Sequence, residues 1–441
     1  MRLLWAGLIL LAASAALPVL RPIYFADHFE LYAFLRVALL VAFGLLIYWG
    51  GVPAVRVKRQ PVQRLNIYDP LLSLRAFACW LVVAGHGLVV VVPEQARMAL
   101  LSENPLYRWL IPEPWFGVWV FFVLSGYLMG KAFYSGRYRF DREGAVGFYQ
   151  NRFLRIAPLY LISTFAIGYL LSNLSIPNAT HWLLLAIFDT DGVAVPTPNT
   201  VLWSVATEMQ FYLAVPFLAP ALARAAGRHL ERALALMLAI LVAAFIYRYL
   251  WKIYGTDYWG AAVYAPLIGN IDLFLSGMIL AYVIQVHRPP APPLWAGFVL
   301  MAALYVVATL AFVVVLSGHE KSVLLVRFLS QTPTAIGTLA IVWCFESRKE
   351  ALSGVWRAIV GWTAPLGILT YGIYAWHAGI MMFLSQWLTS SSRLPEIMLF
   401  FAVEIALAIF LAWLSWRLIE KNSHRFKSRT AHARALTPPA P

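Results

Sequence analysis

Apolar segments about as long as a membrane-spanning helix recur along almost the whole chain. A helix needs about 20 residues to cross the hydrocarbon core of a bilayer, and runs of this kind predict twelve spans. Hydrophobic residues make up 61% of the sequence and charged residues 12%, against about 45–50% and about 25% in soluble domains. We therefore expect an all-α polytopic membrane protein. The predicted spans are 3–20, 31–50, 74–93, 115–134, 154–174, 200–220, 233–253, 264–286, 294–316, 322–345, 357–386 and 396–418.

Basic residues gather at the ends of these spans, and they set the expected orientation. If the spans alternate in direction, the segments rich in Lys and Arg all fall on one side, which the positive-inside rule makes cytoplasmic. Both termini are then cytoplasmic, and the loop 175–199 faces outward. The net charge of +14 reflects this topology rather than binding of nucleic acid. The basic segments are 53–64, 135–155, 222–232, 287–288, 348–357 and the residues from 417 onward.

The chain divides into three expected regions. Residues 1–65 hold two N-terminal transmembrane helices and a basic linker, residues 66–421 form a ten-helix membrane core, and residues 422–441 form a basic, Pro-rich cytoplasmic tail that we expect to be disordered. The two cysteines, Cys79 and Cys344, both lie inside apolar segments. They offer neither a disulfide framework nor the ligand spacing of a zinc site, so no metal is predicted.

An arginine and a histidine share one helix face in the third predicted span. Ten residues separate Arg75 from His86, so the two side chains differ by only about 20° around a helix and by about 16 Å along it. That spacing puts a cation near one membrane surface and an imidazole near mid-depth. Ionisable groups inside a membrane are costly, by about 2.5–3.5 kcal/mol for Arg at a helix centre. The pair therefore indicates function, although an anchoring arginine and a packed histidine are the structural alternative.

Glu208 places a carboxylate inside another predicted span. Ser204, Glu208 and Tyr212 recur at steps of four residues and form a polar stripe on one helix face. A carboxylate at such a depth should be neutral or paired, and it marks a functional site by default. Structural pairing of Glu208 with an arginine is the alternative.

Two arginines, Arg152 and Arg155, stand three residues apart where we expect a span to begin on the cytoplasmic side. Pro158 follows them and suits the first turn of a helix. Paired guanidinium groups can bind phosphate through two parallel hydrogen bonds each. The alternative is that both arginines only anchor the helix end.

A second histidine, His377, lies within a long apolar segment and shares a helix face with Thr370 and Tyr374. A catalytic histidine and a hydrogen-bonded core histidine are both compatible with this pattern. Ser125 and Gly126 lie inside a further apolar segment, where small residues allow close approach of helices. From the residues alone, these two positions indicate a packing notch.

Several motifs follow one another in a fixed order between about Asp69 and Lys421. They are Arg75 with His86, Phe121–Leu128, Arg152 and Arg155 with Pro158, Trp203-Ser204 with Glu208, Phe211 and Tyr212, then Tyr371–His377, and Arg417–Lys421. In this order they resemble the acyltransferase-three family of polytopic membrane proteins, which O-acylate sugars and glycans. The family usually carries Asp-Gly directly before Leu-Arg, where this chain has Leu72 and Ser73. The two N-terminal helices are additions to the usual ten-span plan.

The resemblance implies a reaction and its partners. It implies an acyl-CoA, most often acetyl-CoA, used from the cytoplasm as a cosubstrate, with no tightly bound cofactor. The implied acceptor is a hydroxyl of a carbohydrate or cell-envelope glycan, and the implied location is the cell (inner) membrane. An acyl group carried on His86 and direct attack with His86 as base both fit.

Together, the residues and the resemblance assign three groups of site residues. The predicted catalytic residues are His86, Glu208 and His377. The predicted donor-binding residues are Arg75, Arg152 and Arg155. The predicted supporting residues are Ser125, Ser204, Tyr212 and Tyr374.

The main rival is a polytopic transporter that uses intramembrane His and Glu residues as a proton relay. Transporters of that kind often contain inverted repeats and pairs of broken helices, and the sequence shows neither. A membrane protein without enzymatic activity is a third possibility, but it gives His86 and Glu208 no purpose.

Overall fold

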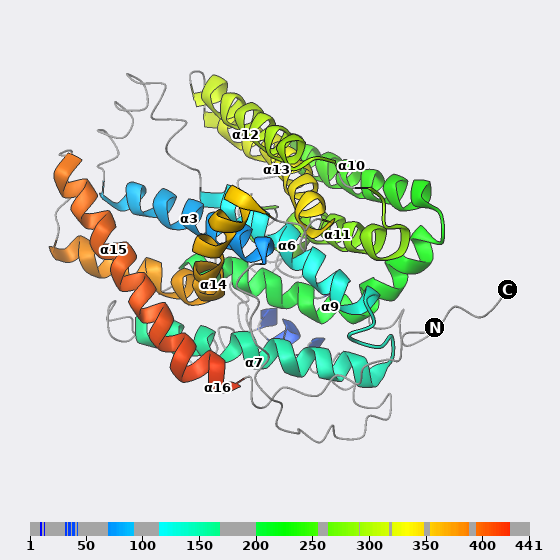
Figure 1. Ribbon diagram of the computed structural model, residues 1–441, viewed down its shortest axis with the longest axis horizontal. Helices are drawn as coiled ribbons and strands as arrows, with labels where there is room; N and C mark the ends of the chain where they lie inside the picture. The colour runs from blue at the N-terminus through cyan, green and yellow to red at the C-terminus, as the bar shows by residue number, and fades with distance from the viewer. Residues whose placement is uncertain are drawn as a thin grey trace.

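The computed structural model describes residues 69–91, 114–167, 200–254, 263–290, 292–316, 320–347, 353–387 and 394–423, with a few isolated positions between 9 and 42. These ranges are almost entirely helical and contain no β-strand (Figure 1). The all-α fold class predicted from the sequence is therefore confirmed for them. The long helices are α3 (Pro70–Val91), α6 (Pro114–Tyr134), α7 (Arg142–Ala166), α9 (Trp203–Ala226), α10 (Leu230–Tyr254), α11 (Leu267–Tyr282), α12 (Leu294–Leu316), α13 (Glu320–Ser347), α14 (Gly354–Trp387) and α15 (Leu394–Ser415). The short helical turns are η2 (Thr200–Leu202), η4 (Val283–His287), η5 (Trp416–Glu420) and α16 (Lys421–Ser423).

Within the described residues, seven helices are long and apolar enough to cross a membrane. They are α3, α6, α9, α10, α11 with η4, α14, and α15 with η5. The predicted total of twelve spans stays a prediction, as does the division into three regions. The spans 3–20 and 31–50, most of the outer loops and the tail from 424 onward lie largely outside the described residues.

The beginning of α7 differs from the sequence prediction. A span was expected to start near 154 with Pro158 in its first turn, but the helix begins at Arg142 and contains Pro158 in its interior. The reason is a helix cap at Asp141, whose side chain accepts a hydrogen bond from the backbone N–H of Gly144 at 2.9 Å. Arg152 and Arg155 consequently lie in the middle of α7 and not at its start.

Glycines bring α6 and α11 into close contact at the centre of the bundle. A Cβ atom on Gly126 would lie 2.0 Å from the carbonyl oxygen of Phe274, and one on Gly130 would lie 2.9 Å from Cα of Met278. The packing notch predicted at Gly126 is therefore confirmed. Because both contacts advance together along the two helices, α6 and α11 run parallel. The ring of Phe274 packs in this interface, and its centroid lies 4.5 Å from the ring centroid of Phe122.

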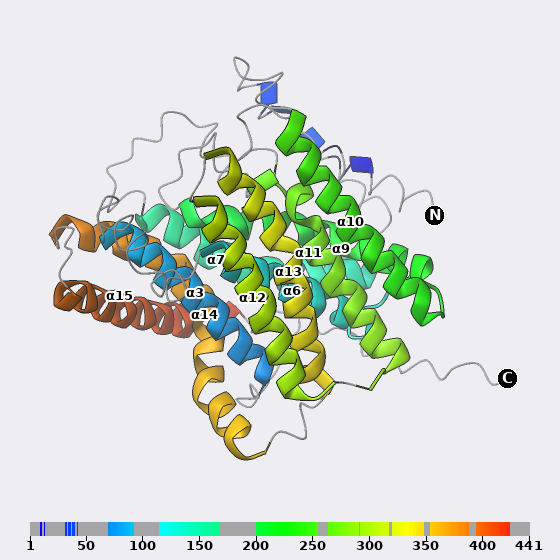
Figure 2. The same cartoon turned by 90° about the horizontal axis from the view of Figure 1, so that it is seen from above.

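The helices α3 and α14 also run parallel and lie side by side in both views (Figures 1 and 2). Thr363 donates a hydrogen bond to Ser73 at 2.8 Å near the beginning of both helices. His86 and His377 meet at 3.1 Å further along both. This parallel pair brings two histidines together that are 291 residues apart in the sequence.

The remaining contacts divide the central helices into two sets of opposite direction. α3 and α6 are antiparallel, since Arg75 lies over Phe121 whereas Ala78 approaches Gly117. The order of contacts also makes α7 parallel to α14, because Ile156 contacts Tyr371 and Ile167 contacts Gly379. It makes α9 parallel to α6, because Ser125 contacts Glu208 and Tyr134 contacts Ala219. Thus α3, α7 and α14 run one way, and α6, α9 and α11 run the other. These directions agree with a chain that crosses the membrane alternately.

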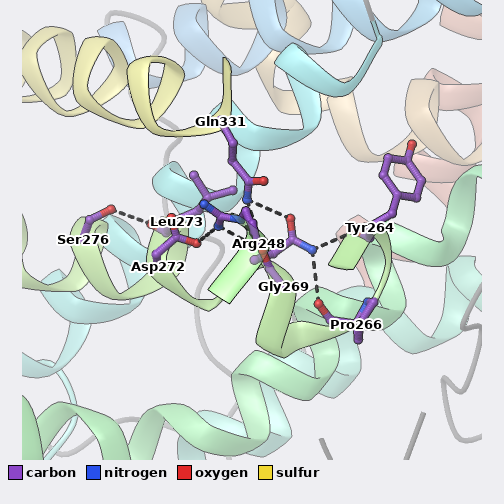
Figure 3. Close-up of polar contacts among 9 residues, drawn as sticks. Arg248, Tyr264, Pro266, Gly269, Asp272, Leu273, Ser276 and Gln331 are labelled. Atoms are coloured by element: carbon purple, nitrogen blue, oxygen red, sulfur yellow. Dashed lines mark hydrogen bonds and ion pairs between the residues drawn. The ribbon is translucent and has the colours of Figure 1, made fainter. Parts of the chain in front are cut away.

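A buried ion pair ties α10, α11 and α13 together (Figure 3). Arg248 on α10 forms an ion pair with Asp272 on α11, and both side chains are completely buried. The Arg248 guanidinium also donates to the carbonyl oxygen of Gly269, at 3.0 Å from Nη2. Gln331 on α13 donates to the side chain of Asn270 at 3.2 Å. Buried charges are tolerated when they are paired and hydrogen-bonded, so this cluster fixes the beginning of α11 within the bundle.

Candidate active site

The centre of the candidate site is a pair of histidines between α3 and α14. Nδ1 of His86 lies 3.1 Å from Nε2 of His377, and the two rings stack with their planes 15° apart. His377 is completely buried, whereas His86 is partly exposed. The two histidines predicted as catalytic thus form one unit.

A backbone carbonyl determines where the protons of this pair lie. Nδ1 of His377 is 2.7 Å from the carbonyl oxygen of Tyr374, which can only accept a hydrogen bond. His377 therefore carries its proton on Nδ1, and its Nε2 accepts a hydrogen bond from Nδ1–H of His86. Neutral His86 then has a lone pair on Nε2. The partly exposed imidazole is available as a base.

A small cavity of about 50 Å³ lies between α3, α6, α9 and α14, and neither histidine lines it. Its wall combines polar groups from segments that are distant in the sequence with an apolar side. The polar lining residues are Arg75, Ser204, Glu208, Thr370, Tyr371 and Tyr374, and the apolar ones are Val118, Phe121, Phe122 and Val205. Four of the predicted site residues therefore meet in one cavity: Arg75, Ser204, Glu208 and Tyr374.

Two hydroxyl groups hold the Glu208 carboxylate. Ser125 on α6 and Tyr212 on α9 both donate hydrogen bonds to the same carboxylate oxygen. In the described part of the chain, no ion pair joins Glu208 to an arginine, contrary to the structural alternative. The neighbouring Thr207 donates to the carbonyl oxygen of Ala265 at 2.5 Å, which ties this turn of α9 to the segment before α11. Ser125, whose residue pattern indicated only packing, is thus a polar partner of Glu208.

Tyr374 connects the cavity to the histidine pair. Its hydroxyl lies 2.5 Å from Oγ of Ser204 in the cavity wall, and its ring centroid lies 5.4 Å from that of His377. The partner of Nδ1 of His86 is His377. Glu208 serves the cavity, and His377 orients His86.

The three predicted donor-binding arginines form a cluster next to the cavity. Arg75 lies over the ring of Phe121 at 5.9 Å, and Arg152 lies over the ring of Tyr212 at 5.9 Å. Arg155 is close enough to Arg75 and to Arg152 for its positive charge to be repelled by both, and the carboxylate of Glu420 acts on it with the opposite sign. Within the described residues, Nε of Arg75 and Nε of Arg152 have no hydrogen-bond partner. Concentrated positive charge with unused donors suits an anionic ligand.

Sequence reasoning missed two polar residues near the site. Tyr371 lines the cavity and donates to the carbonyl oxygen of Ile156 at 2.7 Å, which joins α14 to α7. Glu404 on α15 is completely buried and lies against Gly87, the residue after His86. Glu404 could have been found by the rule that identified Glu208, since both are carboxylates inside apolar spans.

The helices and this site together define an integral-membrane protein with a buried, base-containing centre. Residues 71–417 match the sequence profile of an acyltransferase domain. Because the match covers most of the chain, the protein belongs to this family, the acyltransferase-three family expected from its motifs.

Curated relatives carry names of the same kind. Acyltransferase MdmB of Streptomyces mycarofaciens is 28% identical over 158 residues, which cover 33% of this chain and 38% of MdmB. A Staphylococcus aureus (strain COL) protein, SACOL0978, provisionally named as an O-acetyltransferase, is 23% identical over 337 residues, covering 69% of this chain and 52% of that protein. The chain thus matches about half or less of these relatives. No solved structure matches this chain.

Proposed function

We propose that this protein is a membrane acyltransferase that moves an acyl group, most simply acetyl, from a cytoplasmic acyl-CoA to a hydroxyl of a carbohydrate or cell-envelope glycan. The observation that carries the proposal is the hydrogen-bonded chain from the Tyr374 carbonyl through His377 to His86. It gives His86 a lone pair that can accept the proton of an acceptor hydroxyl. General-base catalysis of this kind typically contributes about 10²–10⁴ in rate.

The arginine cluster supports an acyl-CoA as donor. Coenzyme A carries phosphate groups, and Arg75, Arg152 and Arg155 place three guanidinium groups close together. Guanidinium groups bind phosphate oxygens through paired hydrogen bonds. These arginines lie near the end of the bundle where α3 begins, which the charge pattern predicts to be cytoplasmic.

The size of the cavity and the names of the relatives support acetyl as the acyl group. A volume of about 50 Å³ accommodates a few water molecules, and so a small acyl group rather than a long chain. The staphylococcal relative is provisionally named as an O-acetyltransferase.

The proposed transfer balances without any further reactant. The acceptor oxygen attacks the thioester carbonyl carbon, a C–O bond forms and the C–S bond breaks. His86 Nε2 takes the hydroxyl proton and passes it to the departing thiolate of CoA. In the alternative with two steps, Nε2 attacks the thioester carbonyl carbon and the CoA thiolate leaves. The acceptor oxygen then attacks the same carbon, the C–N bond to Nε2 breaks, and the hydroxyl proton passes to the thiolate.

The test is transfer of labelled acetyl from acetyl-CoA to the envelope glycan by membranes that contain the protein. We expect incorporation that depends on the protein, which a proton-coupled transporter would not catalyse. Arg155→Lys keeps the charge but loses the fork geometry, so the KM for acetyl-CoA should rise about tenfold, the effect of about 1.4 kcal/mol. Arg232→Lys, the same change at an exposed residue of α10, is the control and should behave as wild type. Absence of protein-dependent incorporation would refute the proposed function.

A further inference from the structure

Glu404 is a buried carboxyl group that belongs neither to the cavity lining nor to the hydrogen-bonded histidine pair. Its side chain is completely buried on α15, and neither carboxylate oxygen has a hydrogen-bond partner among the described residues. Burying an ionisable group without a partner is costly, and the cost is higher inside a membrane. Such a residue calls for a partner that is formed during function.

Glu404 lies directly against the helix segment that carries His86. A Cβ atom on Gly87 would lie 2.7 Å from Oε2 of Glu404 and 2.7 Å from the ring of Phe401. Only a glycine at this position lets the carboxyl group reach the α3 backbone so closely. The carboxylate is therefore held beside the residue that follows His86 in the chain.

Among the residues that the structure describes, no carboxylate is hydrogen-bonded to the histidine pair, whereas one orients and stabilises the base in many hydrolase triads. Its hydrogen-bonded chain ends at the backbone carbonyl of Tyr374, which carries no charge. When His86 accepts a proton, the resulting imidazolium needs a nearby negative charge in this low-dielectric setting.

Two other buried carboxylates in the described part of the chain have partners. Glu208 accepts hydrogen bonds from Ser125 and Tyr212, and Asp272 pairs with Arg248. Glu404 differs from both, because neither of its oxygens has a hydrogen-bond partner among the described residues.

We propose that Glu404 is the charge partner of the protonated His86–His377 pair during acyl transfer. This inference rests on the proposed function, in which His86 takes the acceptor proton and returns it to the thiolate of CoA. Glu404 touches neither reacting atom and forms no covalent bond, so it is a positioning residue that stabilises the imidazolium through its charge. Gly87 contributes to the same arrangement, because the absence of a side chain there lets the carboxylate approach the backbone of α3.

The decisive variant is Glu404→Gln, which keeps the size of the side chain but cannot become negatively charged when His86 is protonated. We expect kcat for acetyl transfer from acetyl-CoA to fall about ten- to a hundredfold, as for loss of one nearby charge at low dielectric. The KM for acetyl-CoA should stay within about threefold, since the donor arginines lie elsewhere along α3 and on α7. Glu404→Asp keeps the charge and should retain more activity than Glu404→Gln.

Glu396→Gln is the matched control, because it makes the same change near the beginning of the same helix and should leave kcat unchanged. Membrane level and thermal stability are measured for every variant. Should Glu404→Gln fail to insert, Gly87→Ala gives an independent test, since its methyl group displaces the carboxylate and should lower kcat without raising the KM for acetyl-CoA.

Two results would overturn the role of Glu404 while leaving the proposed function intact. One is wild-type transfer by inserted Glu404→Gln or, if that variant is absent, by Gly87→Ala. The other is an equal loss in Glu404→Asp and Glu404→Gln, which would indicate packing rather than charge. If the wild-type protein itself transfers no acetyl from acetyl-CoA, the proposed function fails first, and the role of Glu404 fails with it.

Discussion

His377 decides which nitrogen of His86 can act as a base. In many hydrolases a carboxylate holds the catalytic imidazole in the correct tautomer. Here a second imidazole does so, itself fixed by a carbonyl of its own helix at 2.7 Å. Because both rings are neutral in this arrangement, the pair can exist inside a membrane without a permanent charge.

We predict that His377→Phe lowers kcat about a hundredfold, because Nδ1–H of His86 then loses its acceptor and the tautomer is no longer fixed. His377→Gln should retain more activity, since the side-chain carbonyl of glutamine can accept the same hydrogen bond. The comparison is made on acetyl transfer by membranes with equal amounts of each protein. Equal activity of the two variants would show that His377 only fills space.

The individual site residues were visible in the sequence, but their pairing was not. His86, Glu208 and His377 each stand out as ionisable groups in apolar spans. Nothing local specifies how a helix is rotated against a neighbour hundreds of residues away, so His377 could not be assigned to His86. The same limit applies to Glu208 and its partner Ser125, which lies on another helix 83 residues away in the sequence.

At the scale of single helices, the length of an apolar run predicted some helix bounds closely. The expected span 294–316 agrees with α12 at both ends. The start of α7 was misplaced by twelve residues because its cap, Asp141, lies in a polar stretch outside the apolar run. A boundary set by a side-chain cap is invisible to hydropathy alone.

The contact between α10 and α11 depends on one buried ion pair, and its removal gives a prediction. Asp272→Asn leaves the charge of Arg248 buried without its counterion, so we expect a loss of about 3–5 kcal/mol in stability. The double variant Arg248→Met/Asp272→Leu removes both charges and should recover most of this loss. Thermal unfolding in detergent measures both effects. If the single and double variants are equally stable, the ion pair does not hold α11 in place.

At the scale of the whole molecule, the helix directions and the charge pattern lead to the same arrangement. α3, α7 and α14 run one way and α6, α9 and α11 the other, so the arginine cluster and the beginning of α3 lie toward one membrane surface. The histidine pair lies about 16 Å further along α3. If the proposed function holds, a donor bound at these arginines, on the side that the charge pattern predicts to be cytoplasmic, would point its acyl group into the bundle.

We predict that the loop 175–199 faces outward and the C-terminal tail faces the cytoplasm, as the positive-inside rule requires. Reporter fusions placed after Asp191 and after Arg434 should therefore report opposite sides of the membrane. Reports from the same side would contradict the alternating topology and separate the arginine cluster from cytoplasmic acyl-CoA.

The measurement that tests the role of His86 most directly is acetyl transfer by the His86→Ala protein. The variant is compared with wild type at equal membrane level and with normal insertion, using labelled acetyl-CoA and the envelope glycan as acceptor. If Nε2 of His86 receives the acceptor proton, transfer should fall by about 10²–10⁴. Transfer at close to the wild-type rate would show that His86 is only a packed histidine, and the catalytic role would pass to Glu208 or His377.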